Sequence, residues 1–206
     1  MQPMHIFYTP DITIPVYTLN EQESKHCTQV LRMSVGNSVL LVDGVGGKYL
    51  ATITSISKKQ VQLTIDSHEK EADKRPFHLH IAMAPTKNID RVEWFMEKAT
   101  ELGIDEFSFV LCDRSERKVV KVDRLEKVVT SAVKQSIKAY HPKVNDVLPF
   151  KKFIQQFSTV AHKYIAHCEE GEKTTLTQDL LPGNACLILI GPEGDFSPLE
   201  IDMALK

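Results

Sequence analysis

The residues best suited to ligand chemistry lie near the end of the sequence, where a short apolar run meets a glycine-containing turn. The run at residues 187–190 is too short for a helix and is typical of a buried strand. It leads into Gly191, Pro192, Glu193 and Gly194, whose two glycines allow the backbone to approach a ligand closely. A strand followed by such a loop favours a ligand site beyond the carboxyl end of the strand. A tight turn that binds nothing fits the same four residues.

The residues around this loop limit the kinds of ligand that it could bind. Glu193 and Asp195 place two carboxylates there, which disfavours a phosphate and favours a neutral or cationic ligand such as a nucleoside or a sulfonium. Ser197, Pro198 and Glu200 have the spacing of an N-cap, a first helical residue and the second member of a capping box. A helix is therefore predicted to begin directly after the loop.

A second candidate for binding chemistry is a basic segment at residues 114–143. It contains nine Lys or Arg residues against three acids, although the whole chain has a net charge of −2. Such a local excess of positive charge is the electrostatic signature of a surface that binds nucleic acid. A solvated helix face carries charge in the same way, so both interpretations stand on charge alone.

The composition excludes several classes of protein. A chain of 206 residues with 42% hydrophobic and 25% charged residues can bury a sizeable core in one or two domains. No apolar run approaches the roughly 20 residues of a membrane helix, and the first residues do not resemble a secretory signal. The cysteines are scattered without a CxxC pair, which predicts reduced thiols, no metal site and a cytoplasmic protein.

The predicted elements fall into two groups separated by a charged stretch at residues 68–76, which is interpreted as a linker. Residues 1–70 have one helix that begins after Asn20, together with short runs rich in Val, Ile and Thr. Turns at the glycines near residue 45 and at residues 58–59 separate these runs, which indicates strands that curl into a small barrel.

Residues 77–206 alternate strand and helix, which predicts an α/β domain with a mostly parallel sheet. Four strands are expected, at residues 78–84, 107–111, 160–167 and 185–190. One helix should carry a buried apolar stripe and stop at Gly103; the stripe comprises Val92, Phe95, Met96, Ala99 and Leu102. Asp123 is the predicted cap of a second helix that reaches about Tyr140.

Several motifs in this order resemble one known family over essentially the whole chain. They are residues 97–103 (EKATELG), 114–117 (RSER), 135–136 (QS) and 190–194 (IGPEG), preceded by His26, Val30–Arg32 and Asp43-Gly44. Together they look like the bacterial 16S ribosomal RNA uridine-N3 methyltransferases, within the SPOUT class. The resemblance implies a PUA-like RNA-binding domain at residues 1–70 and a trefoil-knot α/β methyltransferase domain at 77–206. It also implies a homodimer that uses S-adenosylmethionine and acts on 16S rRNA or on the assembled small ribosomal subunit.

The resemblance assigns expected roles to particular residues. The cofactor pocket would be built from two strand ends, comprising His167, Cys168, Ile190, Gly191, Pro192, Glu193 and Gly194. Methylation of uracil N3 requires loss of a proton, so a base or a cation that stabilises the developing anion is needed. Arg114 and Arg117 are the candidates for the cation, and Glu101, like Glu97, is a weaker candidate for the base. Solvated or ion-paired carboxylates remain an open alternative for both glutamates.

Contacts with RNA are expected from basic and polar residues in both parts of the chain. The candidates are Arg32, Lys48, Arg114, Arg117, Gln135, Ser136 and Lys138. Contacts to phosphates would position RNA without selecting its sequence. For Arg32 and Lys48, an ordinary surface role is the alternative.

Three features depart from the family pattern. The family commonly has glycine at the position of Asp195 and arginine near that of Lys138, and lysine keeps the charge but loses the bidentate fork. Family members also continue beyond the position of Lys206 with a strand and a segment that complete the knot. We therefore expect a C-terminally truncated chain with an incomplete knot.

Two other functions stay open at this level. One is a non-catalytic RNA-binding or ribosome-assembly protein that keeps the same scaffold. The other is an α/β enzyme that binds a phosphate ligand at the glycine loop, against which the acidic Glu193 and Asp195 argue. Binding of S-adenosylmethionine separates the enzyme from the first alternative, and tight binding of a nucleoside triphosphate would favour the second.

Overall fold

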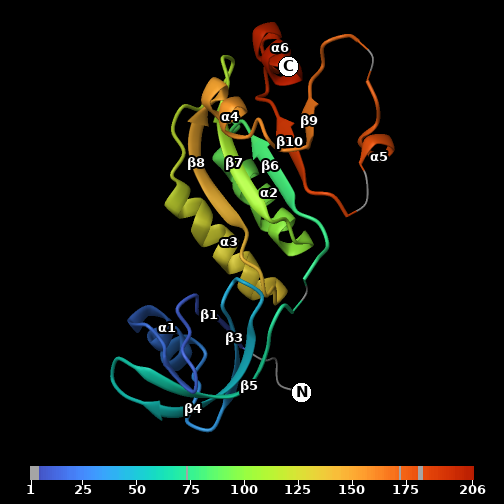
Figure 1. Ribbon diagram of the computed structural model, residues 1–206. Helices are drawn as coiled ribbons and strands as arrows, with labels where there is room; N and C mark the ends of the chain where they lie inside the picture. Colours follow the sequence, from blue (N-terminus) through green and yellow to red (C-terminus); the bar gives the residue numbers. More distant parts are fainter. Residues whose placement is uncertain (1–4, 73, 172, 181–182) are drawn as a thin grey trace. The chain divides into compact units, whose positions relative to one another are not determined.

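The computed structural model describes residues 5–72, 74–171, 173–180 and 183–206 (Figure 1). The chain forms two compact units. The first comprises Met1–Lys74 together with Thr130–His141, and the second comprises Arg75–Val129 and Pro142–Lys206. The last turns of helix α3 (Val122–Ser136) are thus grouped with the N-terminal segment.

The first unit is built on a curled five-stranded sheet with the order β1-β3-β4-β5-β2. Its strands are β1 (Ile6–Tyr8), β2 (Val16–Thr18), β3 (Ser38–Val42), β4 (Lys48–Ile56) and β5 (Val61–Glu69). β1 and β3 are parallel, the other pairs are antiparallel, and two irregularities in the β4–β5 pairing help the sheet to bend. Alternating residues of these strands fill a core that includes Phe7, Leu41, Ile53 and Leu63.

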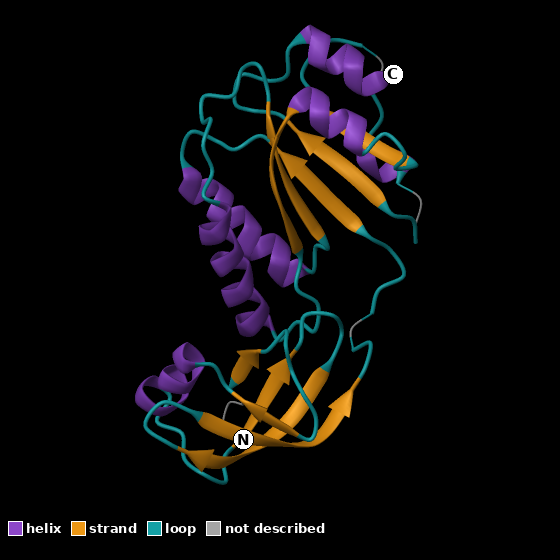
Figure 2. Cartoon of the chain, turned by 60° about the vertical axis from the view of Figure 1, so that its left-hand side comes forward, coloured by secondary structure: helices purple, strands orange, loops and turns teal. Residues whose placement is uncertain are grey.

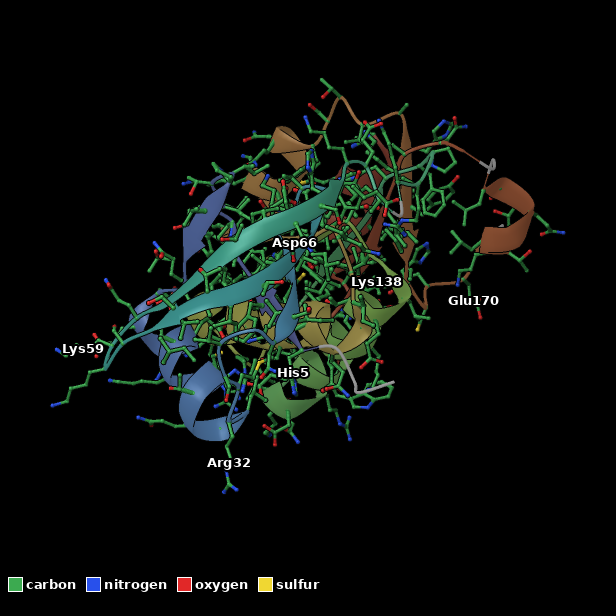
Figure 3. All side chains as sticks on the ribbon, turned by 90° about the horizontal axis from the view of Figure 1, so that it is seen from below. His5, Arg32, Lys59, Asp66, Lys138 and Glu170 are labelled. Atoms are coloured by element: carbon green, nitrogen blue, oxygen red, sulfur yellow. The ribbon has the colours of Figure 1, made fainter. Side chains whose placement is uncertain are left out.

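The helical segment of this unit begins as the sequence predicts. The Asn20 side chain accepts a hydrogen bond from the Glu23 backbone N–H at 2.8 Å, which caps α1 (Glu21–Lys25). The helix then widens into a π-helical turn, η1 (His26–Val30). Figure 3 shows Arg32 and Lys59 extending away from the ribbon of this unit.

The second unit contains a five-stranded sheet with the order β8-β7-β6-β10-β9, and every pair in it is parallel. The strands are β6 (Leu79–Met83), β7 (Glu106–Leu111), β8 (Lys143–Pro149), β9 (His162–Ala166) and β10 (Cys186–Ile190). Helix α2 (Ile89–Leu102) packs on one face, where Phe95 meets Phe107. Helices α4 (Phe150–Gln156) and α6 (Pro198–Leu205) pack on the other face, and a short helix, α5 (Leu176–Asp179), precedes β10 (Figure 2).

The structure confirms the boundaries predicted for α2 and corrects part of its stripe. Gly103 ends the helix in a left-handed conformation with φ 95°, and Val92 and Met96 are fully buried. Leu102, however, is 84% exposed, so its prediction as a core residue is wrong. It is the last residue of the helix, and in the same turn Thr100 is the buried residue, at 1% exposed.

Two other predictions need correction. β8 was not predicted, because its sequence carries Asn145 and Asp146 and lacks a continuous apolar run; it lies at the edge of the sheet, where one side of a strand is unpaired. α3 begins at Val122, so Asp123 lies in its first turn and is not its N-cap. There the carboxylate still favours the helix through its dipole.

Candidate functional site

The loops that follow β6, β7, β9 and β10 meet at one edge of the parallel sheet. Ile190 at the end of β10 pairs with Met83 of β6 on one side and with Ala166 of β9 on the other. Carboxyl ends of parallel strands share an edge, which is where ligands bind in open α/β sheets. The glycine loop predicted from the sequence lies at this edge.

The backbone of the glycine loop requires glycine at one position and tolerates aspartate at another. A Cβ atom at residue 191 would lie 2.9 Å from the ring of Phe196, which is fully buried, so a side chain does not fit there. Asp195 adopts a left-handed conformation with φ 61°, which explains why the resembled family uses glycine here. Its carboxylate accepts hydrogen bonds from the backbone N–H groups of Phe196 and Cys168, both at 2.8 Å.

Both carboxylates of the loop stay ionised at neutral pH. The Lys87 N–H donates to Glu193 Oε1 at 2.9 Å, and this bond holds the pKa of Glu193 below its ordinary value. Partial burial would raise the pKa of Asp195, but the N–H groups of Cys168 and Phe196 and the nearby positive charges lower it overall. The loop therefore presents negative charge and suits a cationic or neutral ligand.

The two arginines of the RSER motif donate to backbone carbonyls of the neighbouring loops. Arg114 Nη1 donates to the Gly194 carbonyl oxygen at 2.9 Å. Arg117 Nε donates to the Thr86 carbonyl oxygen at 3.0 Å, and its Nη2 donates to that of Lys87 at 2.5 Å. These bonds tie the loop after β7 to the loops after β6 and β10. A guanidinium has five N–H donors, so the exposed Arg114 keeps donors for a further partner.

A buried carboxylate completes the connection between the loops after β7 and β10. Glu200 is 2% exposed; its Oε2 accepts from the Ser197 N–H and its Oε1 from the Asp113 N–H, both at 2.9 Å. The Ser197 hydroxyl in turn donates to Asp113 Oδ2 at 2.7 Å. The predicted capping box is confirmed, and its glutamate also fixes the residue before Arg114. Spacing along the chain gave no signal for this second contact.

The predicted wall formed by the end of β9 is joined to the glycine loop through one bond. The Cys168 N–H is the donor to Asp195 described above, and the Cys168 side chain is exposed. Nδ1 of His167 is buried and has no hydrogen-bond partner among the described residues. A buried polar atom without a partner is unfavourable, so this atom is a candidate for contact with a bound molecule.

The other predicted residues have the following contacts and exposure. Glu101 is paired with Lys98 at 3.0 Å, and so is Glu97 at 2.7 Å, as the ion-paired alternative anticipated. In the first unit, Arg32 is exposed and Lys48 is half-buried at the start of β4. Ser136 donates to the Ala132 carbonyl oxygen at 2.6 Å. Gln135 is exposed at the end of α3, and Lys138 is half-buried just beyond it.

The described residues contain no group of three or more His, Cys, Asp or Glu side chains that could hold a metal ion. None of the helices in the described ranges is long and apolar enough to cross a membrane.

Comparison with known proteins identifies the two parts of the chain. Residues 73–206 match the family model of the RNA methyltransferase domain, and residues 19–66 match that of the RNA methyltransferase PUA domain. The chain is 26% identical to ribosomal RNA small subunit methyltransferase E of Bacillus subtilis over 203 residues, which is 91% of this chain and 78% of that protein.

Solved structures agree with this match. A probable rRNA-methyltransferase of Porphyromonas gingivalis is 36% identical and superposes with a TM-score of 0.90, covering 98% of this chain and 85% of that one. A Legionella pneumophila protein solved with bound S-adenosylmethionine is 26% identical, with a TM-score of 0.85 and the same coverage. The chain belongs to the RNA methyltransferase family, with a PUA domain followed by an RNA methyltransferase domain.

Proposed function

We propose that this protein transfers a methyl group from S-adenosylmethionine to N3 of a uridine in 16S ribosomal RNA. The observation that carries the proposal is the acidic glycine loop, tied to three other strand-end loops, in a chain of this family. The name of the Bacillus subtilis relative supports the small-subunit RNA as substrate, and the Legionella pneumophila complex supports the methyl donor.

The residues at the sheet edge fit S-adenosylmethionine. When bound, it supplies an electrophilic methyl group on a cationic sulfonium. The ionised Glu193 and Asp195 favour that charge, whereas they would repel a phosphate. Gly191 allows the ring of Phe196 to pack against the loop backbone, and His167 Nδ1, which has no partner among the described residues, supplies a polar contact. We assign His167, Cys168 and residues 190–194 to this pocket.

The protein side of the reaction is mainly positioning and charge stabilisation. Holding the reacting atoms about 3–3.5 Å apart can account for a large part of the rate. Loss of the N3 proton leaves negative charge on the uracil ring, and the free donors of Arg114 can stabilise it. Arg117 has two bonds to loop carbonyls and therefore serves first to position them. Glu101 is already bonded to Lys98, so it stays the weaker candidate for the base.

The remaining parts of the proposal concern partners and location. We assign RNA contacts to Arg32, Lys48, Arg114, Arg117, Gln135, Ser136 and Lys138, and we propose a cytoplasmic homodimer that acts on 16S rRNA or the small subunit. The domain limits that we propose are residues 1–70 and 77–206.

The test is a methyl-transfer assay with labelled S-adenosylmethionine and small subunits that lack the modification. Mass spectrometry of the digested 16S rRNA should then find one methyl group on N3 of a uridine. Binding of the RNA with neither cofactor affinity nor methyl transfer would favour the non-catalytic alternative.

A further inference from the structure

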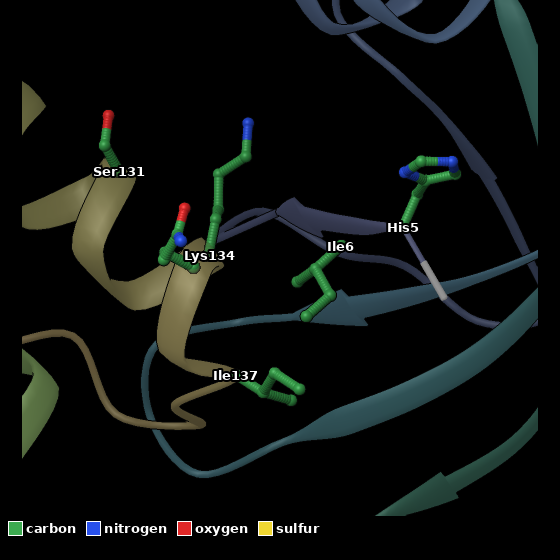
Figure 4. Close-up of a pocket in the computed structure, with 6 residues that line it drawn as sticks. His5, Ile6, Ser131, Lys134 and Ile137 are labelled. Carbon is green, nitrogen blue, oxygen red and sulfur yellow. The ribbon is translucent and has the colours of Figure 1, made fainter. Parts of the chain in front are cut away.

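A cavity in the first unit has no role in the site described above. It has a volume of about 360 Å³ and is lined by His5, Ile6, Ser131, Lys134, Gln135 and Ile137 (Figure 4). Ile6 comes from β1, and Ser131, Lys134 and Gln135 come from the last turns of α3. The volume lies in the range of small-molecule sites, and the lining combines branched apolar side chains with an amide, a hydroxyl, an imidazole and an ammonium group.

The backbone at Ile137 is unusual for its residue type. Ile137 has φ 57°, and the next residue, Lys138, donates its N–H to the Val133 carbonyl oxygen at 3.1 Å. This arrangement ends a helix, and its left-handed position is normally glycine, because a β-branched side chain is strained there. Ile137 is 49% exposed, so burial in the core does not compensate for the strain. Local strain of this kind is concentrated at functional sites.

The charges around the cavity argue against an isolated phosphate as its ligand. Lys134 is paired with Glu23, with Nζ and Oε1 2.8 Å apart, so its positive charge is already balanced. The cavity also lies at the carboxyl end of α3, where the helix dipole is negative. A ligand with a flat apolar ring and a polar edge suits the lining better than an anion does.

We propose that this cavity accepts one unstacked nucleobase of the RNA substrate, and this rests on the function proposed above. The ring would lie against Ile6 and Ile137, and the imidazole of His5 can stack on it. The carboxamide of Gln135 has both a donor and an acceptor, so it can pair with the edge of the base. The site recognises an extruded base in single-stranded RNA, and its lining includes no residue of the glycine loop.

The experiment compares two cavity variants with matched controls in the full chain. Ile137→Gly removes the apolar wall and the backbone strain, and Gln135→Ala removes the amide. Both should weaken binding of a single-stranded 16S rRNA fragment, measured by fluorescence anisotropy, by about five- to tenfold. Val35→Ala, at an exposed branched residue of a turn, and Gln156→Ala, at an exposed glutamine of α4, should bind like the wild type.

Three further measurements make the test specific. Ile137→Gly should raise or preserve the unfolding temperature while it weakens binding, a combination that a purely structural role does not produce. Abasic substitutions placed in turn along the fragment should weaken binding to the wild type at one nucleotide, and the loss at that nucleotide should be smaller in Gln135→Ala. Inorganic phosphate should compete with the RNA equally well in the wild type and in Gln135→Ala, and weaker competition in the variant would overturn the assignment of a base.

The inference and the proposed function can fail separately. Unchanged RNA affinity in both cavity variants would overturn the nucleobase site, even if the wild type methylates 16S rRNA. Weakened RNA binding in both variants would support the site even if the wild type transferred no methyl group, which would instead remove the proposed reaction.

Discussion

The two ends of the parallel sheet use polar side chains in different ways. At the carboxyl end, Arg114, Arg117 and Glu200 bond to backbone groups of loops that are distant in sequence. Toward the amino end, polar side chains bond mainly to one another. His80 Nε2 lies 2.8 Å from Ser108 Oγ, and Asn145 Nδ2 donates to Ser108 at 2.8 Å and to Glu106 at 2.6 Å.

We infer that the side chains at the carboxyl end mainly position the binding loops, whereas those at the amino end mainly stabilise the fold. Side chains bonded to loop backbone fix irregular segments that strand pairing does not hold, which suits a binding site. The His80 cluster spans β6, β7 and β8 beneath Phe153 and Phe157 of the α4 segment, where His80 and Ser108 are buried. Such a network must be fully satisfied, because a buried group that loses its partner costs free energy. Changes at the carboxyl end should therefore affect cofactor binding most, and changes at the amino end should affect the free energy of unfolding most.

The largest effect should be a loss of stability at low pH, caused by His80 at the amino end of the sheet. Burial lowers the pKa of His80 to about 4, against an ordinary value near 6.5. Between these values the unfolded chain binds more protons, so the free energy of unfolding should fall by up to about 3 kcal/mol as the pH drops from 6.5 to 4. Urea unfolding at a series of pH values measures this slope.

The slope can be assigned with two histidine variants. His80→Gln should flatten it, whereas His78→Gln should keep most of it, because burial is the main cause of the low pKa of His80 and the His78 side chain, 3.6 Å from Glu106, is 50% exposed. An unchanged slope in His80→Gln would remove His80 as its source. Below this window, Glu106 should cause a further loss of stability: burial opposes its ionisation, but its bonds to Asn145 and Lys143 leave its pKa below the ordinary value.

A smaller effect on stability, with a clear effect on function, is expected from Glu200→Gln. The amide has one oxygen where the carboxylate offers two acceptors to Ser197 and Asp113, so one N–H loses its partner at a cost of about 1–3 kcal/mol. The loop that carries Arg114 should loosen, and the KM for S-adenosylmethionine should rise. Asp202→Asn, at an exposed site of the same helix, is the control. Equal KM values in the two variants would contradict a positioning role for Glu200.

The smallest effect should distinguish the two arginines. Arg117→Lys keeps the charge but cannot bond to both the Thr86 and Lys87 carbonyl groups, which should cost about 1 kcal/mol in cofactor binding, or about fivefold. Arg114→Lys can retain its single bond to Gly194 and should change cofactor affinity less. Calorimetric titration measures both, and the reverse order would contradict the assigned contacts.

Much of the fold followed from local patterns. Residues 187–200 showed strand, loop and capped helix because apolar runs, glycines and capping residues act within a few positions. The α2 boundaries followed from Gly103 and the apolar period for the same reason. β8 was not predicted, because an edge strand can carry polar residues without losing its pairing on one side.

The contacts that hold the loops of the site together were harder to predict from the sequence. The RSER motif identified Arg114 and Arg117, but their partners are separated from them by 80 and 31 positions and are backbone carbonyls, which leave no residue-type signal. The contact of Glu200 with Asp113, 87 positions away, was hidden for the same reason. The knot and the catalytic roles of Arg114, Arg117 and Glu101 stay predictions.

Hydrogen–deuterium exchange with and without S-adenosylmethionine tests most directly whether the carboxyl end of the sheet is the methyl-transfer site. The cofactor should protect backbone amides at residues 84–88, 112–117, 167–168 and 191–197, and should leave the amides around His80, Glu106 and Asn145 unchanged. Protection confined to the amino end of the sheet, or none in the presence of saturating cofactor, would contradict the account.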